Sequence, residues 1–151
     1  MMSKKPSYLG LLNAVAVGEL GGEALFTAWA GATNNDNVRA VLNTVALREG
    51  EHAKSFAKRI DELGYSVRDR RDPRLDERLK TARSTKISDR KKFEKLGFAK
   101  PQSDGPDIFS RFFDDVTIDI QTGELLGRYI SEERDTARRL NACYAALSAK
   151  K

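Results

Sequence analysis

Apolar residues recur every three or four positions along three long stretches of this chain of 151 residues. This spacing places apolar side chains on one face of an α-helix, whereas a half-buried strand would alternate at every second residue. No run of alternating residues bounded by turn signals is present. The sequence therefore predicts an all-α fold, and the length fits a single domain, residues 1–151, with a core of its own.

The N-terminal part is expected to form a helical hairpin over residues 6–63. The first helix runs from about Pro6 to Ala30, and the second runs from Asn37 to Leu63. Asn34, Asn35 and Asp36 supply turn and N-cap chemistry between them, and Gly64 is a suitable C-terminal stop. Because the connection is about five residues long, the two helices are expected to lie antiparallel.

The rest of the chain divides into an insert, residues 65–105, and C-terminal helices over residues 106–149. Within the insert, Asp72–Ser84 and Ser88–Leu96 each show a cap followed by a thinly apolar helical pattern, and they are expected to cover the outside of the bundle. After it, Asp107–Val116 predicts a compact apolar helix. The last long helix is expected from about Asp119 or Thr122 to Ala149.

Charge and cysteine content narrow the functional classes. The net charge is +5, but Arg68–Lys100 alone carries +7, with 13 Lys or Arg and six Asp or Glu, and the rest carries −2. Nucleic acid is therefore an unlikely partner, since the acids of the insert dilute any phosphate-binding stripe. The single Cys excludes disulfides and Cys-x-x-Cys metal sites and fits a cytoplasmic protein. No stretch approaches the roughly 18 apolar residues of a membrane span, so no membrane is expected.

Ionisable residues interrupt the apolar faces of the hairpin. Glu19 and Glu23 lie on the buried face of the first helix, while Glu49 and His52 occupy consecutive positions on the buried face of the second. A buried carboxylate is costly unless it is paired, protonated or bound to a cation. Residues three apart on a helix share a face, so Glu49 and His52 can offer an oxygen and a nitrogen to one metal ion.

Glu19 on one helix and Glu49-x-x-His52 on its antiparallel neighbour resemble the first half-site of ferritin-like, rubrerythrin-like carboxylate-bridged di-iron proteins. The resemblance covers Leu9–Leu63 and part of Gln121–Tyr144. It implies a ferritin-like four-helix bundle, in which the basic insert forms a long helical crossover between the second and third core helices.

In that family a second half-site repeats the pattern, with a Glu on the third helix and Glu-x-x-His on the fourth. The resemblance therefore implies Glu132 and Asp135 as ligands, with Asp where the family has His. The helical spacing instead places Glu133 on the buried face, so Glu133 is the competing ligand. The third-helix ligand stays open, because none of the nearby acids stands in a recognisable frame: Asp114, Asp115, Asp119 and Glu124.

The resemblance implies one or two iron or manganese ions per chain and oxidase, peroxidase or oxygenase chemistry of a di-iron oxidoreductase. An external electron donor would be needed, since the chain has no thiolate iron centre, and a homodimer is expected because such bundles associate through helix faces. The alternative is a bundle with a degenerate or absent metal centre that acts as an interaction or structural module. In that case His52 belongs to a buried ion pair, and Glu132, Glu133 and Asp135 form ordinary ion pairs with nearby arginines.

Overall fold

The protein is described by a computed structural model in which residues 4–70, 72–100, 112 and 114–149 are placed. Five α-helices account for its regular structure: α1 (Leu9–Ala32), α2 (Asp36–Glu62), α3 (Leu75–Arg83), α4 (Asp89–Leu96) and α5 (Ile120–Ala149). No strand occurs among these placed residues, so the all-α prediction is confirmed.

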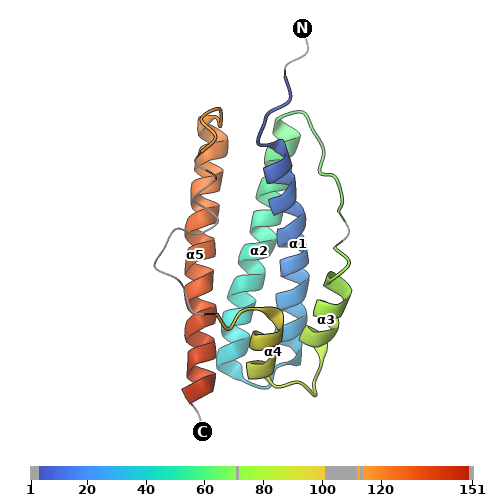
Figure 1. Cartoon of the computed structure of the whole chain (residues 1–151), viewed down its shortest axis with the longest axis vertical. Coiled ribbons are helices and arrows are strands. Elements are labelled where there is room, and N and C mark those ends of the chain that lie inside the picture. The colour runs from blue at the N-terminus through green and yellow to red at the C-terminus, as the bar shows by residue number, and fades with distance from the viewer. Residues whose placement is uncertain (1–3, 71, 101–111, 113, 150–151) are drawn as a thin grey trace.

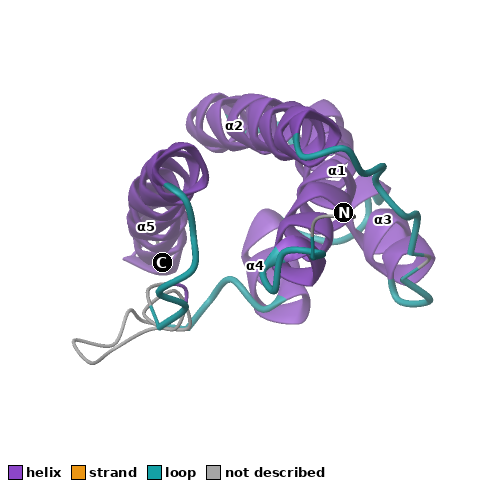
Figure 2. Ribbon diagram, turned by 90° about the horizontal axis from the view of Figure 1, so that it is seen from above, coloured by secondary structure: helices purple, strands orange, loops and turns teal. Residues whose placement is uncertain are grey.

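The three long helices lie side by side, with α2 between α1 and α5 (Figure 1). Helix α1 runs antiparallel to α2, and α5 again runs opposite to α2. Seen from above, α3 and α4 lie on the side of α1 that faces away from α2 (Figure 2). Of these, α3 packs on α1, and α4 contacts both α3 and α5.

Two apolar clusters form the core, one toward each end of the long helices. One gathers around Leu12, Phe56 and Leu126, and the other around Trp29, Leu42 and Phe93. Glu19, Glu49 and His52 are buried between the two clusters along α1 and α2. The helices are therefore held by apolar packing above and below a charged layer, and that layer cannot shift without disturbing both clusters.

The hairpin ends where its turn residues predict. The Asn35 side chain caps α2 by accepting hydrogen bonds from the backbone N–H groups of Asn37 and Val38, at 3.0 and 3.1 Å. Gly64, just past the end of α2, has a φ of +89°, a conformation that glycine adopts without strain. The helix boundaries differ from the predicted ones by at most three residues.

The insert does more than cover the bundle. Phe93 of α4 is fully buried, and its ring lies edge-on to Trp29 with centroids 4.7 Å apart. Asp89 accepts hydrogen bonds from Trp29 Nε1 at 2.9 Å and from Thr33 Oγ1 at 2.6 Å, so the start of α4 is tied to the end of α1. The buried Lys92 donates to the carbonyl of Ala82 at 2.8 Å.

The predicted helix Asp107–Val116 falls mostly on residues 101–111 and 113, which lie outside the described residues. Its described end, residues 114–116, forms a bend and a turn. Among the described residues three long helices are present, so a four-helix ferritin-like bundle is not established.

Helix α1 also has the length and hydropathy of a membrane-spanning helix, with a mean hydropathy of 1.3 over its best window. A core helix of a soluble protein passes the same test. Helix α1 packs on α2 and buries Glu19 beside His52, and 39% of that window is buried.

Candidate metal centre

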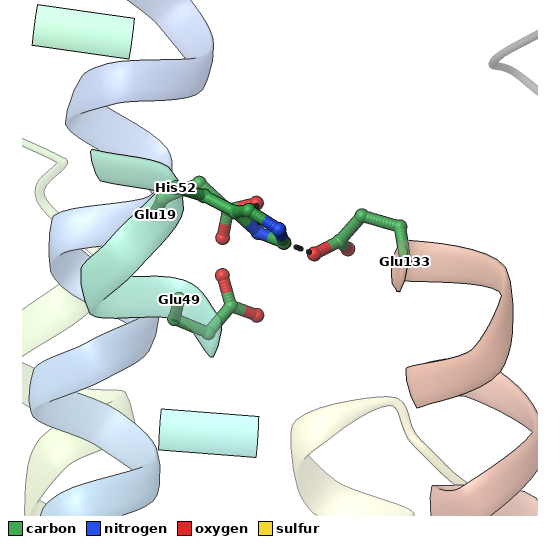
Figure 3. Close-up of side chains that lie close together, drawn as sticks. All are labelled: Glu19, Glu49, His52 and Glu133. Atoms are coloured by element: carbon green, nitrogen blue, oxygen red, sulfur yellow. Dashed lines mark ion pairs between the residues drawn. The ribbon is translucent and has the colours of Figure 1, made fainter. Parts of the chain in front are cut away.

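Four ionisable side chains from three helices converge in the charged layer between the two apolar clusters. Glu19 comes from α1, Glu49 and His52 come from successive turns of α2, and Glu133 comes from α5. One ligand atom of each lies within 4.8 Å of the ligand atoms of the other three. Figure 3 shows the four side chains pointing toward a common centre. We refer to these four residues as the carboxylate–histidine group.

The three hairpin members of the group are buried and incompletely bonded. Glu19, Glu49 and His52 are 6%, 7% and 5% exposed. Each has one buried polar atom without a hydrogen-bond partner, namely Glu19 Oε1, Glu49 Oε2 and His52 Nδ1. Buried polar atoms in native proteins nearly always find a partner. Two of these atoms, Glu19 Oε1 and His52 Nδ1, lie 3.4 Å apart as an ion pair. Together with Glu49 Oε2 they fit a cation that would bind all three.

His52 is surrounded by carboxylates. Its Nδ1 lies 3.4 Å from Glu19 Oε1 and 3.5 Å from Glu133 Oε1, and its Nε2 lies 3.3 Å from Glu132 Oε1. Burial disfavours the imidazolium, but Glu133, Glu19 and Glu132 stabilise it more and raise the pKa of His52 to about 10. Without a metal ion His52 is therefore protonated at neutral pH.

Burial shifts the pKa of the Glu19 carboxyl in the opposite direction from that of His52, because the charged form of a carboxyl group is the deprotonated one. It raises the pKa of Glu19 to about 7, and the negative charge of Glu133 adds to this, although the nearby His52 favours the ionised form. Tyr129 stands one turn before Glu133, with its ring edge-on to His52 at 5.0 Å between centroids. Burial, the charges of Glu19 and Glu133, and a hydrogen bond to Glu19 raise the pKa of the Tyr129 hydroxyl. Tyr129 thus helps to orient Glu19.

The two consecutive glutamates of α5, Glu132 and Glu133, lie differently with respect to the carboxylate–histidine group. Glu133 belongs to the carboxylate–histidine group, as the helical spacing indicated. Glu132 also reaches the site from its edge, where its carboxylate lies between His52 and Arg128, at 3.3 and 3.2 Å. These two cations outweigh the desolvation of Glu132 and lower its pKa.

Asp135, the other residue that the resemblance implied, is not brought into the group. Its carboxylate pairs with Arg48 at 2.8 Å and with Arg139 at 2.7 Å. Hydrogen bonds from these two arginines lower the pKa of Asp135 to about 2. Two residues further along a helix than Glu133, Asp135 points to a different side of α5. The position where the resemblance led us to expect a ligand therefore carries an ion-pair network instead.

Glu23 is outside the group of four but adjoins it. Its carboxylate occupies the space beside Gly50, where an added Cβ would lie 1.7 Å from Glu23 Oε2. In turn, the Glu49 carboxylate lies over Gly22, where an added Cβ would be 3.1 Å away. Each carboxylate therefore rests on a glycine of the opposite helix. Sequence reasoning missed both glycines, although a glycine inside a helix is itself a signal of close approach.

Two of the four acids considered for a third-helix ligand have other partners, while Asp114 and Glu124 are exposed. Asp115 accepts a hydrogen bond from Ser7 Oγ at 2.6 Å. Asp119 binds Arg59 and the Tyr8 hydroxyl, both at 2.8 Å. Neither belongs to the carboxylate–histidine group among the described residues.

Three carboxylates and one imidazole form a donor set that suits iron, manganese or zinc better than calcium or magnesium, which prefer oxygen ligands alone. The three carboxyl groups outnumber the single imidazole, so a divalent cation complements the group. Comparison with protein-family models, with curated protein sequences and with solved structures finds no match to this chain.

Proposed function

We propose that this chain is a metal-binding protein whose carboxylate–histidine group holds a divalent iron or manganese ion. The observation that carries this proposal is the convergence of three buried polar atoms that lack a hydrogen bond, from Glu19, Glu49 and His52, with the carboxylate of Glu133. Such atoms are costly to bury unless something binds them. The four ligands account for one ion, and a second ion would need ligands beyond this group.

Each residue has a separate role in this proposal. Glu19, Glu49 and Glu133 supply oxygen ligands, and His52 supplies a nitrogen after losing its proton. Tyr129 holds Glu19 in place, and Glu132 is positioned to accept a hydrogen bond from His52 Nε2 and fix the ring. A bound iron or manganese ion would supply one-electron redox chemistry with dioxygen or peroxide, so we propose an oxidoreductase that draws electrons from an external donor.

Metal analysis tests the proposal directly. Chelator-treated protein is loaded anaerobically with Fe²⁺ or with Mn²⁺ and then washed. The metal that stays bound is quantified, and bound Mn²⁺ is also followed by electron paramagnetic resonance. We expect about one ion per chain, and less than about 0.1 contradicts the proposal. Glu49→Gln should abolish binding, whereas Glu51→Gln, an exposed neighbour on the same helix, should bind as the wild type does.

The second candidate is a helical interaction or structural module in which His52 itself neutralises the carboxylates. It is favoured by the distances of 3.3–3.5 Å from His52 to three glutamates. Removing charge from an incompletely paired group can be stabilising. If Glu49→Gln raises the urea midpoint and the wild type binds no ion, this second candidate is correct.

The homodimer, the cytoplasmic location and the absence of membrane and nucleic-acid partners remain predictions. Light scattering of the purified protein measures whether it is a dimer. Binding of a labelled DNA duplex at low and physiological salt tests for a nucleic-acid partner, because contacts to phosphates weaken steeply as salt is raised.

A further inference from the structure

A large open cleft borders the carboxylate–histidine group. It has a volume of about 1340 Å³, and its walls come from α1, α2, α5 and the chain around α3 and after α4. Glu19, Glu49 and Glu133 line the cleft, whereas His52 is not part of its lining. The group therefore presents its carboxylates, and not its imidazole, to the open side.

The charges that line the cleft are divided unevenly between its walls. The walls formed by α1, α2 and α5 carry one cationic residue, Lys54, against four carboxylates: Glu19, Glu23, Glu49 and Glu133. The other cationic residues of the lining all come from residues 69–100, where three aspartates accompany them. Acidic walls raise the local concentration of cations in a cleft, so this side of the cleft favours the approach of a cation to the group.

Glu23 is the carboxylate of these walls that does not belong to the carboxylate–histidine group. It stands one turn after Glu19 on α1, and its carboxylate rests against Gly50, the residue after Glu49. It is half-buried, whereas Glu19 and Glu49 are buried. Glu23 has no hydrogen bond or ion pair with any described residue. An unpaired carboxylate therefore stands on the solvent side of two buried ones.

We propose that Glu23 is the entry residue of the metal site. A hydrated divalent cation that enters the cleft exchanges one of its water molecules for a Glu23 oxygen, and it then passes to the buried carboxylates of Glu49 and Glu19. A cation held by one carboxylate keeps most of its water, so the remaining water can be replaced in steps. This inference rests on the proposed function, because it describes how the same site is filled.

An entry residue and a ligand of the bound ion differ in their kinetic effects. Loss of a ligand destabilises the bound state, so the ion dissociates faster. Loss of an entry residue raises the barrier that separates the free from the bound ion, so association slows and dissociation does not become faster. The association and dissociation rate constants of Mn²⁺ therefore distinguish the two roles.

Stopped-flow mixing of chelator-treated protein with Mn²⁺ measures these constants, with the free ion followed by a fluorescent chelator that Mn²⁺ quenches. Glu23→Gln keeps the size of the side chain, and we expect it to lower the association rate constant about tenfold without faster dissociation. Glu23→Asp keeps a carboxylate and should recover most of the lost rate. Glu51→Gln removes the same charge from an exposed neighbour of the group outside the cleft lining, and it should bind at the rate of the wild type.

Equal association rate constants in Glu23→Gln and Glu51→Gln overturn this inference alone, because the position of Glu23 in the cleft would then have no effect. Faster dissociation from Glu23→Gln also overturns it, since Glu23 would then be a ligand of the bound ion. If the wild type takes up no Mn²⁺, the proposed function fails and this inference fails with it. Circular dichroism and urea denaturation verify that each variant folds.

Discussion

Gly22 and Gly50 allow the carboxylates of Glu49 and Glu23 to approach the opposite helix closely. A Cβ at Gly22 would lie 3.1 Å from the Glu49 carboxylate, which is closer than ordinary van der Waals contact. Glycine inside a helix costs about 0.5–1 kcal/mol relative to alanine. Both residues therefore cost helix stability and give room to an ionisable side chain.

Gly22→Ala separates these two effects. We expect the free energy of unfolding of the metal-free protein to stay equal or rise by up to about 1 kcal/mol, because alanine favours the helix. Affinity for Mn²⁺ should fall about tenfold, because Glu49 must move away from its ligand position. Gly18→Ala is the control, since no atom lies within 4 Å of its Cβ position. Equal Mn²⁺ affinities in calorimetric titrations of the two variants would contradict this prediction.

The proton on His52 predicts how metal affinity depends on pH. With a pKa of about 10, His52 stays protonated from pH 6.5 to 9 and must release its proton to bind an ion. Apparent affinity for Mn²⁺ should therefore rise by about tenfold per pH unit while one proton is displaced. Titrations in two buffers with different ionisation enthalpies count the released protons, and a pH-independent affinity contradicts the role of His52.

The same pKa fixes the pH dependence of stability without metal. The imidazolium of His52 is stabilised in the folded state, because its pKa rises from 6.5 in the unfolded chain to about 10. Its contribution is fully present below pH 6.5 and is lost as pH rises toward 10. The urea midpoint of the metal-free protein should therefore fall between pH 7 and 10. In His52→Gln this fall should be absent.

At the scale of single residues the sequence identifies the hairpin members of the carboxylate–histidine group but leaves the member from the last helix open. Glu19, Glu49 and His52 interrupt clear apolar stripes, so their burial follows from periodicity alone. Glu132 and Glu133 are consecutive, and both end beside His52, an arrangement that depends on the rotation of α5 against α2. That rotation is set by tertiary packing and by the ion pairs of Asp135, neither of which the local sequence shows.

At the scale of elements, Asp119 fixes where α5 begins and how it docks on the hairpin. Its carboxylate accepts hydrogen bonds from Tyr8, from Arg59 and from the backbone N–H of Thr122. Asp119→Ala removes both the N-cap of α5 and the contacts to Tyr8 and Arg59, so we expect a loss of about 1–2 kcal/mol in the free energy of unfolding. Urea denaturation measures it, with the exposed Asp114→Ala as the control. Equal midpoints for the two variants contradict this role.

Four element boundaries lie where a cap or a glycine marked them, whereas α3 begins at Leu75, three residues after the predicted cap at Asp72. Asn35, Gly64, Ser88 and Gly97 all act in the structure as their residue types indicated. The burial of Phe93 against Trp29 was not predictable, because α4 is short and carries few apolar residues. Its docking depends on Asp89, whose partners lie more than 50 residues away.

For the whole molecule, the carboxylate–histidine group stands where three helices meet and two apolar clusters separate. Helix α5 contributes Glu133 to this group and otherwise packs against α2 and α4. An ion bound by ligands from α1, α2 and α5 would therefore cross-link α5 to the hairpin. Metal binding and the docking of α5 should be thermodynamically coupled.

This coupling predicts where the metal-loaded protein becomes more protected. At a free metal concentration of 100 times Kd, binding stabilises the folded state by about 2.7 kcal/mol. We expect hydrogen exchange to slow most in α5 around Glu133, because the hairpin keeps its apolar packing with or without metal. Glu133→Gln should remove the metal-dependent protection of α5 but leave the three ligands of the hairpin and weaker binding there. Uniform slowing in all helices would contradict a cross-link, since the ion would then act on global unfolding alone.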